Sequence, residues 1–202
     1  MEAFAGKAEG YKLDMSSEIN YHALLALAYI SKKDFELAYR TAETVETFLS
    51  QIEPTAYFTF TGYMNVPVVF LLVAQQLTKP NTTLRIRASL KVVLERSRKA
   101  LDHLAKFAHI YPFAEPRLLL WQGVIDQLTG RIDRAQERWR QSLSLATKLE
   151  MVYDEGLALY RIGKCTDVKD SHQVVQEKLA SVDKALDIFT QIGAVYTELL
   201  IE

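Results

Sequence analysis

Cysteine is almost absent from this chain. The 202 residues include one, Cys165, so no disulfide can form within the chain. A disulfide scaffold of the kind that small secreted domains use is therefore excluded, and a reducing compartment is expected. An excess of charge of either sign is also missing, since the formal net charge is −1. Whole-chain charge thus favours neither nucleic acid nor an acidic membrane surface as a partner.

Long apolar segments are missing as well. The longest run, residues 66–74 (VPVVFLLVA), is shorter than the ~20 residues that a membrane-spanning helix needs. The first residues, MEAFAGKAEGYKLD, lack the basic and then apolar pattern of a secretion signal. We therefore expect a cytoplasmic protein without membrane contact.

The motifs of common catalytic sites are absent. The chain has no G-x-x-x-x-G-K-[ST] phosphate loop, no G-x-G-x-x-G and no H-E-x-x-H. Cys165 has no activating constellation, and acids such as Asp154 and Glu155 stand where the first turn of a helix favours negative charge. None of the four histidines has the spacing of a metal-ligand pair. We expect no catalytic residue, no metal site and no cofactor, and hence no enzyme. The histidines are His22, His103, His109 and His172.

Residues 117–150 (RLLLWQGVIDQLTGRIDRAQERWRQSLSLATKLE) carry the most informative pattern. Small and large residues recur there at the spacing of a tetratricopeptide-type helix hairpin, with Gly130 where one helix must stop and the next must start. The small residues allow two helix backbones to approach, and the large ones fill the seam. The pattern consists of Leu119, Gly123, Gly130, Ile132, Ala135 and Trp139.

The remaining chain also reads as helices. Aligning Ala38 with Ala135 repeats the pattern in the first hairpin. The apolar segment before residue 78 favours a buried helix that Pro67 kinks or that starts near Asn65, with a strand over residues 66–73 as the alternative. A lead-in over residues 1–15 precedes the helices. The expected helices span about 18–30, 35–52, 56–77 and 84–109, and a loop is expected over 78–83.

A second repeat signal lies nearer the C-terminus. Residues 142–156 (SLSLATKLEMVYDEG) match residues 185–199 (ALDIFTQIGAVYTEL) at an offset of 43, with a polar loop over 164–171 between them. A fixed offset is typical of helical repeat arrays. We predict an all-α, right-handed superhelix of nine or ten helices, forming one domain over residues 16–202. Its last repeat is incomplete and ends in an apolar helix, 194–202, that packs back, dimerises or awaits further repeats.

Four stretches resemble a known family. They are residues 55–63 (TAYFTFTGY), 116–123 (PRLLLWQG), 139–143 (WRQSL) and 153–158 (YDEGLA). They are similar to the C-terminal region of signalling proteins that join class III adenylate or guanylate cyclase domains to an AAA-type ATPase and a tetratricopeptide-like tail. The resemblance covers roughly residues 20–202 and implies a regulatory or scaffolding tail. It carries no active-site residue onto this chain.

Three functions remain open. The first is a protein–protein interaction module that holds a partner helix or peptide in a concave groove, with Gln122, Asp126 and Asn20 as candidate groove residues. The second is a nucleic-acid-binding array that uses the basic segment 84–109, where seven cations face two acids. Pairing of those cations with Glu43, Glu46 and Glu53 is the simpler interpretation. The third is an enzyme with a site between helices.

Two aromatic features also have two interpretations. Trp121 and Trp139 stand on the two arms of one hairpin, where they either line a ligand groove or fill the seam between the helices. Packing is the preferred interpretation. A cluster of tyrosines and phenylalanines is likewise read as core, with a peptide-binding surface as the alternative. Its members are Tyr57, Phe58, Phe60, Tyr63, Tyr111 and Phe113.

Overall fold

The computed structural model describes residues 14–80, 82, 84, 86–165 and 172–194, and every regular element in that part is helical. The all-α class is therefore confirmed, whereas the alternative strand at residues 66–73 is wrong. The described residues form eight α-helices and two 3₁₀ turns, Tyr57–Thr59 and Pro112–Ala114. The predicted count of nine or ten, which includes a helix over residues 194–202, is not confirmed. The helices are α1 Met15–Ser31, α2 Phe35–Leu49, α3 Phe60–Thr78, α4 Leu90–Ile110, α5 Glu115–Leu128, α6 Ile132–Lys148, α7 Val152–Lys164 and α8 His172–Gln191.

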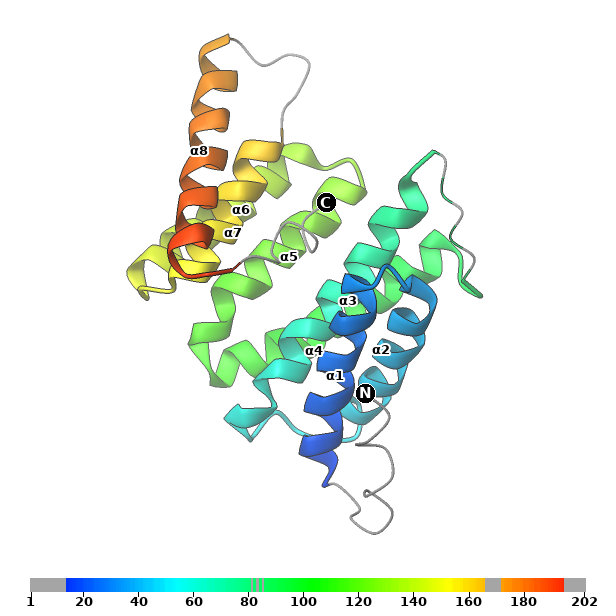
Figure 1. The fold of residues 1–202 in the computed structure, drawn as a ribbon. Helices are drawn as coiled ribbons and strands as arrows, with labels where there is room; N and C mark the ends of the chain where they lie inside the picture. Colours follow the sequence, from blue (N-terminus) through cyan, green and yellow to red (C-terminus); the bar gives the residue numbers. More distant parts are fainter. Residues whose placement is uncertain (1–13, 81, 83, 85, 166–171, 195–202) are drawn as a thin grey trace.

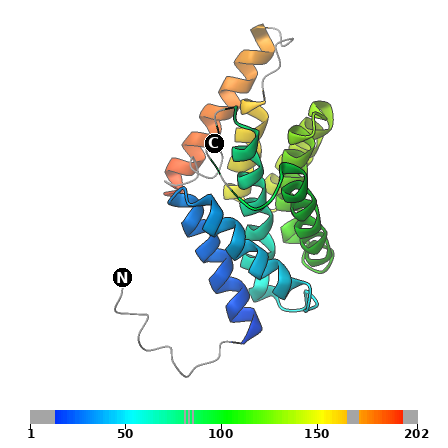
Figure 2. The same ribbon diagram turned by 90° about the vertical axis from the view of Figure 1, so that its right-hand side faces the viewer.

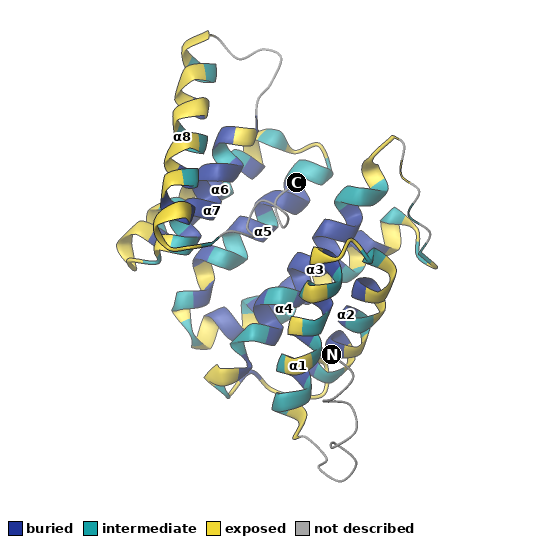
Figure 3. Cartoon of the chain, in the orientation of Figure 1, coloured by how far each residue is buried: buried dark blue, intermediate teal, exposed yellow. Residues whose placement is uncertain are grey.

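The eight helices form four hairpins that stack in chain order (Figure 1). Each first helix packs on its own second helix and also on the next first helix, so α1, α3, α5 and α7 form one layer. Each second helix packs on the first helix of the following hairpin. The two views place α1 and α2 at one end and α8 at the other (Figure 2). Buried residues gather where the hairpins face one another (Figure 3). No hairpin thus buries its apolar faces alone.

The same turn ends four of the helices. A residue with positive φ follows each helix, and the next backbone N–H donates to the carbonyl five residues earlier, at 2.8–2.9 Å. This is the Schellman arrangement, which satisfies carbonyls that a helix end leaves open. The predicted offset of 43 relates two of these turns, those at Glu150 and Gly193. The positive-φ residues are Lys33 (60°), Gly130 (77°), Glu150 (55°) and Gly193 (70°).

Replacing Glu150 by glycine is expected to raise the free energy of unfolding by about 0.5–1 kcal/mol. The left-handed conformation costs an L-residue ~1–2 kcal/mol, and the greater entropy of glycine in the unfolded chain offsets part of the gain. Gly130→Ala is the matched reverse change, because a Cβ at Gly130 meets nothing within 4 Å and its effect is conformational alone. Urea unfolding of both variants measures the change in the free energy of unfolding, which should be a gain for Glu150→Gly and a loss for Gly130→Ala. A destabilised Glu150→Gly variant would contradict it.

Close approach of small and large residues holds the paired helices together. The Trp139 side chain is fully buried, and its Nε1 donates to the Leu120 carbonyl at 3.1 Å. A Cβ on Gly123 would lie 2.4 Å from that Nε1, so the indole occupies the space that glycine leaves. Gly156 stands in the same relation to Phe189 between α7 and α8. The packing role predicted for Trp139 is confirmed.

Helix α3 lies at the centre of the molecule, and twelve of its residues are buried. It begins at Phe60 and continues through Pro67, so the alternative start near Asn65 is wrong. Together with the preceding 3₁₀ turn it forms a helical segment, Tyr57–Thr78, of 22 residues, whose most apolar 18-residue window has a mean hydropathy of 1.5. That segment is long and apolar enough to cross a membrane by length and composition alone, while 72% of its most apolar window is buried against other parts of the protein.

The starts of α4 and α1 also differ from the prediction. Helix α4 begins at Leu90 instead of Leu84, because the Ser89 side chain accepts a hydrogen bond from the Val92 N–H and caps the helix there. Ile86 still packs against the core, which explains why its apolar spacing resembled a helix. Helix α1 begins at Met15, earlier than predicted, with Asp14 as its cap.

Several predictions fall on residues outside the described part. These are the lead-in over 1–13, the polar loop over 166–171 and the apolar C-terminal helix beyond Ala194. Cys165, which was expected in that loop, directly follows the last residue of α7 as its C-cap and is buried.

Candidate functional site

A cavity of about 200 Å³ lies between the first helices of all four hairpins. The wall of the cavity is both apolar and polar, because it contains aliphatic and aromatic side chains together with one amide and one guanidinium group. Concave, mainly apolar pockets with a few polar groups are the usual places for ligands. We call this cavity and the surrounding face of α1, α3, α5 and α7 the inner groove. It is lined by Leu27 of α1, Asn65 and Val68 of α3, Arg117 and Trp121 of α5, and Tyr153 and Leu157 of α7.

An ion pair fixes one end of the inner groove. Arg117 Nε lies 2.5 Å from Asp154 Oδ1, and both side chains are largely buried. The Arg117 guanidinium also stands 5.1 Å from the centre of the Tyr153 ring. Both contacts tie the first turn of α5 to the first turn of α7. The structural role predicted for Asp154 is thus supported, and its partner is a cation as well as the helix dipole.

Arg161 extends the groove along α7. Tyr153, Leu157 and Arg161 are spaced four residues apart, so they share one face of the helix. The Arg161 guanidinium lies 5.7 Å from the ring centre of Trp121, which lines the cavity. Only 6% of Arg161 is exposed, and no acidic side chain forms an ion pair with it in the described part of the chain. Burial lowers the pKa of Arg161 to about 10.

Two buried donors in this region have no acceptor. They are Nη2 of Arg161 and Nε1 of Trp121, and neither has a hydrogen-bond partner within residues 14–80, 82, 84, 86–165 and 172–194. An unsatisfied buried donor destabilises the folded state, and an unpaired buried charge does so more strongly. The contact between the guanidinium and the indole ring compensates only part of this cost. The pair is therefore a polar site that lacks an acceptor.

The sequence did not single out Arg161. In the sequence, Arg161 is the only charged residue of an apolar stretch, residues 156–163 (GLALYRIG). A single arginine in such a stretch is expected to lie on the exposed, polar face of an amphipathic helix. Only the stacking of α5 beside α7 places Trp121 over it.

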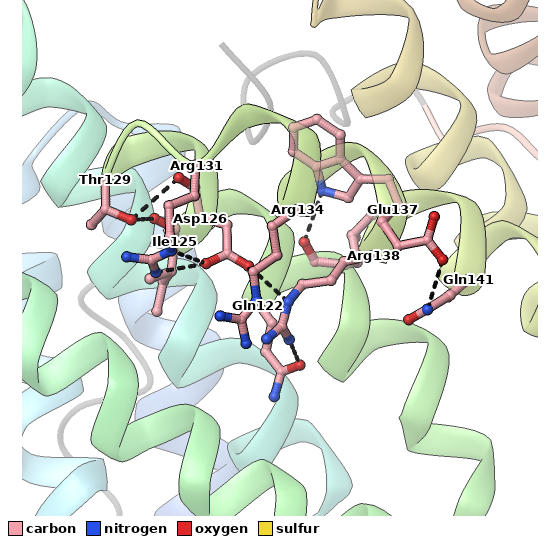
Figure 4. A network of polar contacts seen from close by, with 11 residues as sticks. Gln122, Ile125, Asp126, Thr129, Arg131, Arg134, Glu137, Arg138 and Gln141 are labelled. Carbon is pink, nitrogen blue, oxygen red and sulfur yellow. Dashed lines mark hydrogen bonds and ion pairs between the residues drawn. The ribbon is translucent and has the colours of Figure 1, made fainter.

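Asp126, which was predicted to line the groove, is instead a buried acceptor. Its side chain is 3% exposed and faces three arginines (Figure 4). Arg131 Nη2 lies 2.6 Å from Oδ1, while Arg138 Nε lies 2.7 Å and Arg134 Nε 3.5 Å from Oδ2. Burial lowers the pKa of Arg138, and the charge of Arg134 adds to this. Asp126 thus joins α5 to α6 and does not belong to the inner groove.

The other two predicted groove residues also lie elsewhere. Gln122 accepts a hydrogen bond from Arg138 and borders a separate cavity of about 270 Å³ (Figure 4). Asn20 donates from Nδ2 to the Phe58 carbonyl at 2.9 Å, which holds the 3₁₀ turn against α1. The second cavity is lined by Arg98, Leu101, Asp102, Gln122, Ile125, Arg131 and Arg138.

The basic segment is partly neutralised by α2. Arg96 pairs with Glu43 at 2.8 Å and with the buried Glu46, and Lys99 Nζ lies 3.3 Å from Glu46. The pairing predicted with Glu43 and Glu46 is confirmed. Because the helix starts at Leu90, Arg87 precedes it and does not continue a row of cations along α4.

The histidines and the buried cysteine form no constellation in the described ranges. No group of three or more His, Cys, Asp or Glu side chains there could hold a metal ion. His22 lies 3.2 Å from Glu18 on its own helix. Burial and the charges of Lys106 and Lys99 lower the pKa of His103.

Comparison with protein-family models, with curated proteins and with solved structures finds no significant match for this chain.

Proposed function

We propose that this chain is a protein-interaction module with a tetratricopeptide-like, right-handed arrangement of its hairpins, and that it binds a partner peptide in the inner groove. The observation that carries the proposal is the lining of the cavity, which comes from the first helix of every hairpin. Stacked helix pairs present such a continuous face, and an extended peptide or a helix can lie along it.

The setting of this module rests on the sequence. The resemblance to the tails of cyclase–ATPase signalling proteins supports a regulatory or scaffolding role without catalysis. The single cysteine supports a cytoplasmic location. The partner of the module is then a protein segment.

A variant that fills the cavity tests this function. Random peptides are selected on the full chain, and the affinity of each enriched peptide is measured for wild type and for Asn65→Trp. Asn65 lines the cavity and is half-buried, so a large ring there occupies the space without burying a charge. We expect at least a tenfold loss of affinity, about 1.4 kcal/mol.

Leu179→Trp is the matched control, because it introduces the same side chain on α8 where Leu179 is 50% exposed. It should leave affinity unchanged. The proposal fails when no peptide is enriched, or when Asn65→Trp and wild type bind the enriched peptides equally well.

A further inference from the structure

Arg161 and Trp121 form a site whose chemistry is incomplete without a ligand. Both Nη2 and Nε1 are hydrogen-bond donors, both are buried, and neither has an acceptor among the residues that the structure describes. Their side chains stack, with the guanidinium 5.7 Å from the indole centre. Trp121 lines the cavity and the Arg161 guanidinium lies beside its ring, so an acceptor that enters from the cavity approaches both donors together.

The charge around Arg161 defines the ligand further. The nearest charged pair in the groove, Arg117 with Asp154, is already matched, so its acid is engaged elsewhere. No acidic side chain of the described residues compensates the positive charge at the Arg161 end of the groove. Charge balance calls for one negative charge on the ligand, and two acceptor atoms with one charge describe a carboxylate.

The neighbouring wall defines what carries the carboxylate. Leu157 and Tyr153 continue the α7 face from Arg161 into the cavity, and Val68 and Leu27 lie in the same lining. The ligand therefore reaches the guanidinium beside an apolar surface. A peptide that bears an acidic residue next to apolar residues fits both parts.

We infer that the inner groove recognises an acidic residue of its partner peptide, whose carboxylate is bound by Arg161 Nη2 and Trp121 Nε1. This rests on the proposed function and adds the chemistry of its partner. It also accounts for a buried cation that has no acidic partner in the described part of the chain. A group kept at a cost in stability is expected where binding needs it.

The test compares acidic peptides with their amides. Each peptide enriched on the wild-type chain is made with Asp or Glu and with Asn or Gln at the same position. Wild type should bind the acid about tenfold or more tightly than the amide, because a charge-assisted hydrogen bond is lost. In Arg161→Met the two forms should bind alike. Trp121→Phe keeps the ring and removes the donor, so it should reduce the ratio several-fold.

The stability of Arg161→Met gives a second readout. Replacing an unpaired buried charge by an apolar side chain of similar length should leave the midpoint of unfolding unchanged or raise it. A purely structural arginine would instead give a lower midpoint and an unaltered acid-to-amide ratio. Either of those results overturns the inference.

The two proposals fail in different ways. Suppose that the enriched peptides bind Asn65→Trp more weakly than wild type, but that wild type binds their acid and amide forms equally well. Binding in the groove then stands and the carboxylate site is rejected. When Asn65→Trp has no effect on binding, or no peptide is enriched, both are rejected.

Discussion

Replacing Trp139 by alanine should lower the free energy of unfolding by about 3–5 kcal/mol, the range for aromatic truncations in a core. The side chain is fully buried between α5 and α6, and its Nε1 bond to Leu120 would be lost with it. Urea unfolding measures the loss. The free energy of unfolding of a Trp139→Phe variant should lie between those of wild type and Trp139→Ala, since phenylalanine keeps most of the contact area.

A double-mutant cycle with Gly123 shows whether the seam works as described. In wild type, Gly123→Ala places a methyl group 2.4 Å from Trp139 Nε1, and overpacking of this kind costs about 1–3 kcal/mol. In the Trp139→Ala background that atom is gone. Alanine then favours the helix over glycine by ~1 kcal/mol, so the same change should stabilise the protein. Equal effects of Gly123→Ala in both backgrounds would contradict a direct contact.

This seam was predictable from the sequence because it depends on local spacing. Gly123 and Trp139 lie on consecutive helices with one short turn between them, and Gly130 marks that turn with its positive φ. The two Schellman turns related by the offset of 43 were detectable for the same reason. Features set by residues close in the chain leave a periodic trace in its sequence.

The candidate site depends on contacts between hairpins, which spacing does not encode. Arg161 is polar by composition, yet Trp121 of the preceding hairpin covers it. Asp126 resembled a groove residue because polar residues on a first helix often face the concave side. Instead, Arg131 in the turn before α6 and Arg138 within α6 form ion pairs with Asp126. The start of α4 was predicted too early, at Leu84, because the apolar spacing continues before the helix, whereas the Ser89 cap sets its first residue at Leu90.

Under the proposed function, stability and binding depend on different sides of α5. The side that faces α6 holds Gly123 against the Trp139 indole and Asp126 in ion pairs with arginines. The side that faces α7 holds Arg117, which is paired with Asp154, and Trp121, whose buried Nε1 has no acceptor among the described residues. Changes on the first side should therefore act on folding, and changes on the second should act on affinity.

Asp126→Asn is the sharpest test of the folding side, with an expected loss of about 2–4 kcal/mol in the free energy of unfolding. Breaking a fully buried ion pair costs ~3–5 kcal/mol because a charge stays behind without compensation. The loss here is smaller because Arg131 and Arg134 have 47% and 62% of their side chains exposed and can turn to water. The side chain of Arg138 is only 19% exposed, so most of the loss in the free energy of unfolding comes from leaving its charge without a partner.

A graded series separates this network from an ordinary surface pair. Arg138→Gln should cost more than Arg134→Gln, which should cost less than ~1 kcal/mol because an exposed ion pair gains little. Urea unfolding at low and high salt measures all three variants. The effect of Asp126→Asn should persist at high salt, since buried charges are screened less than exposed ones. An Asp126→Asn variant as stable as wild type would show that the three arginines do not need the carboxylate, and that α5 and α6 are held by the Trp139 seam alone.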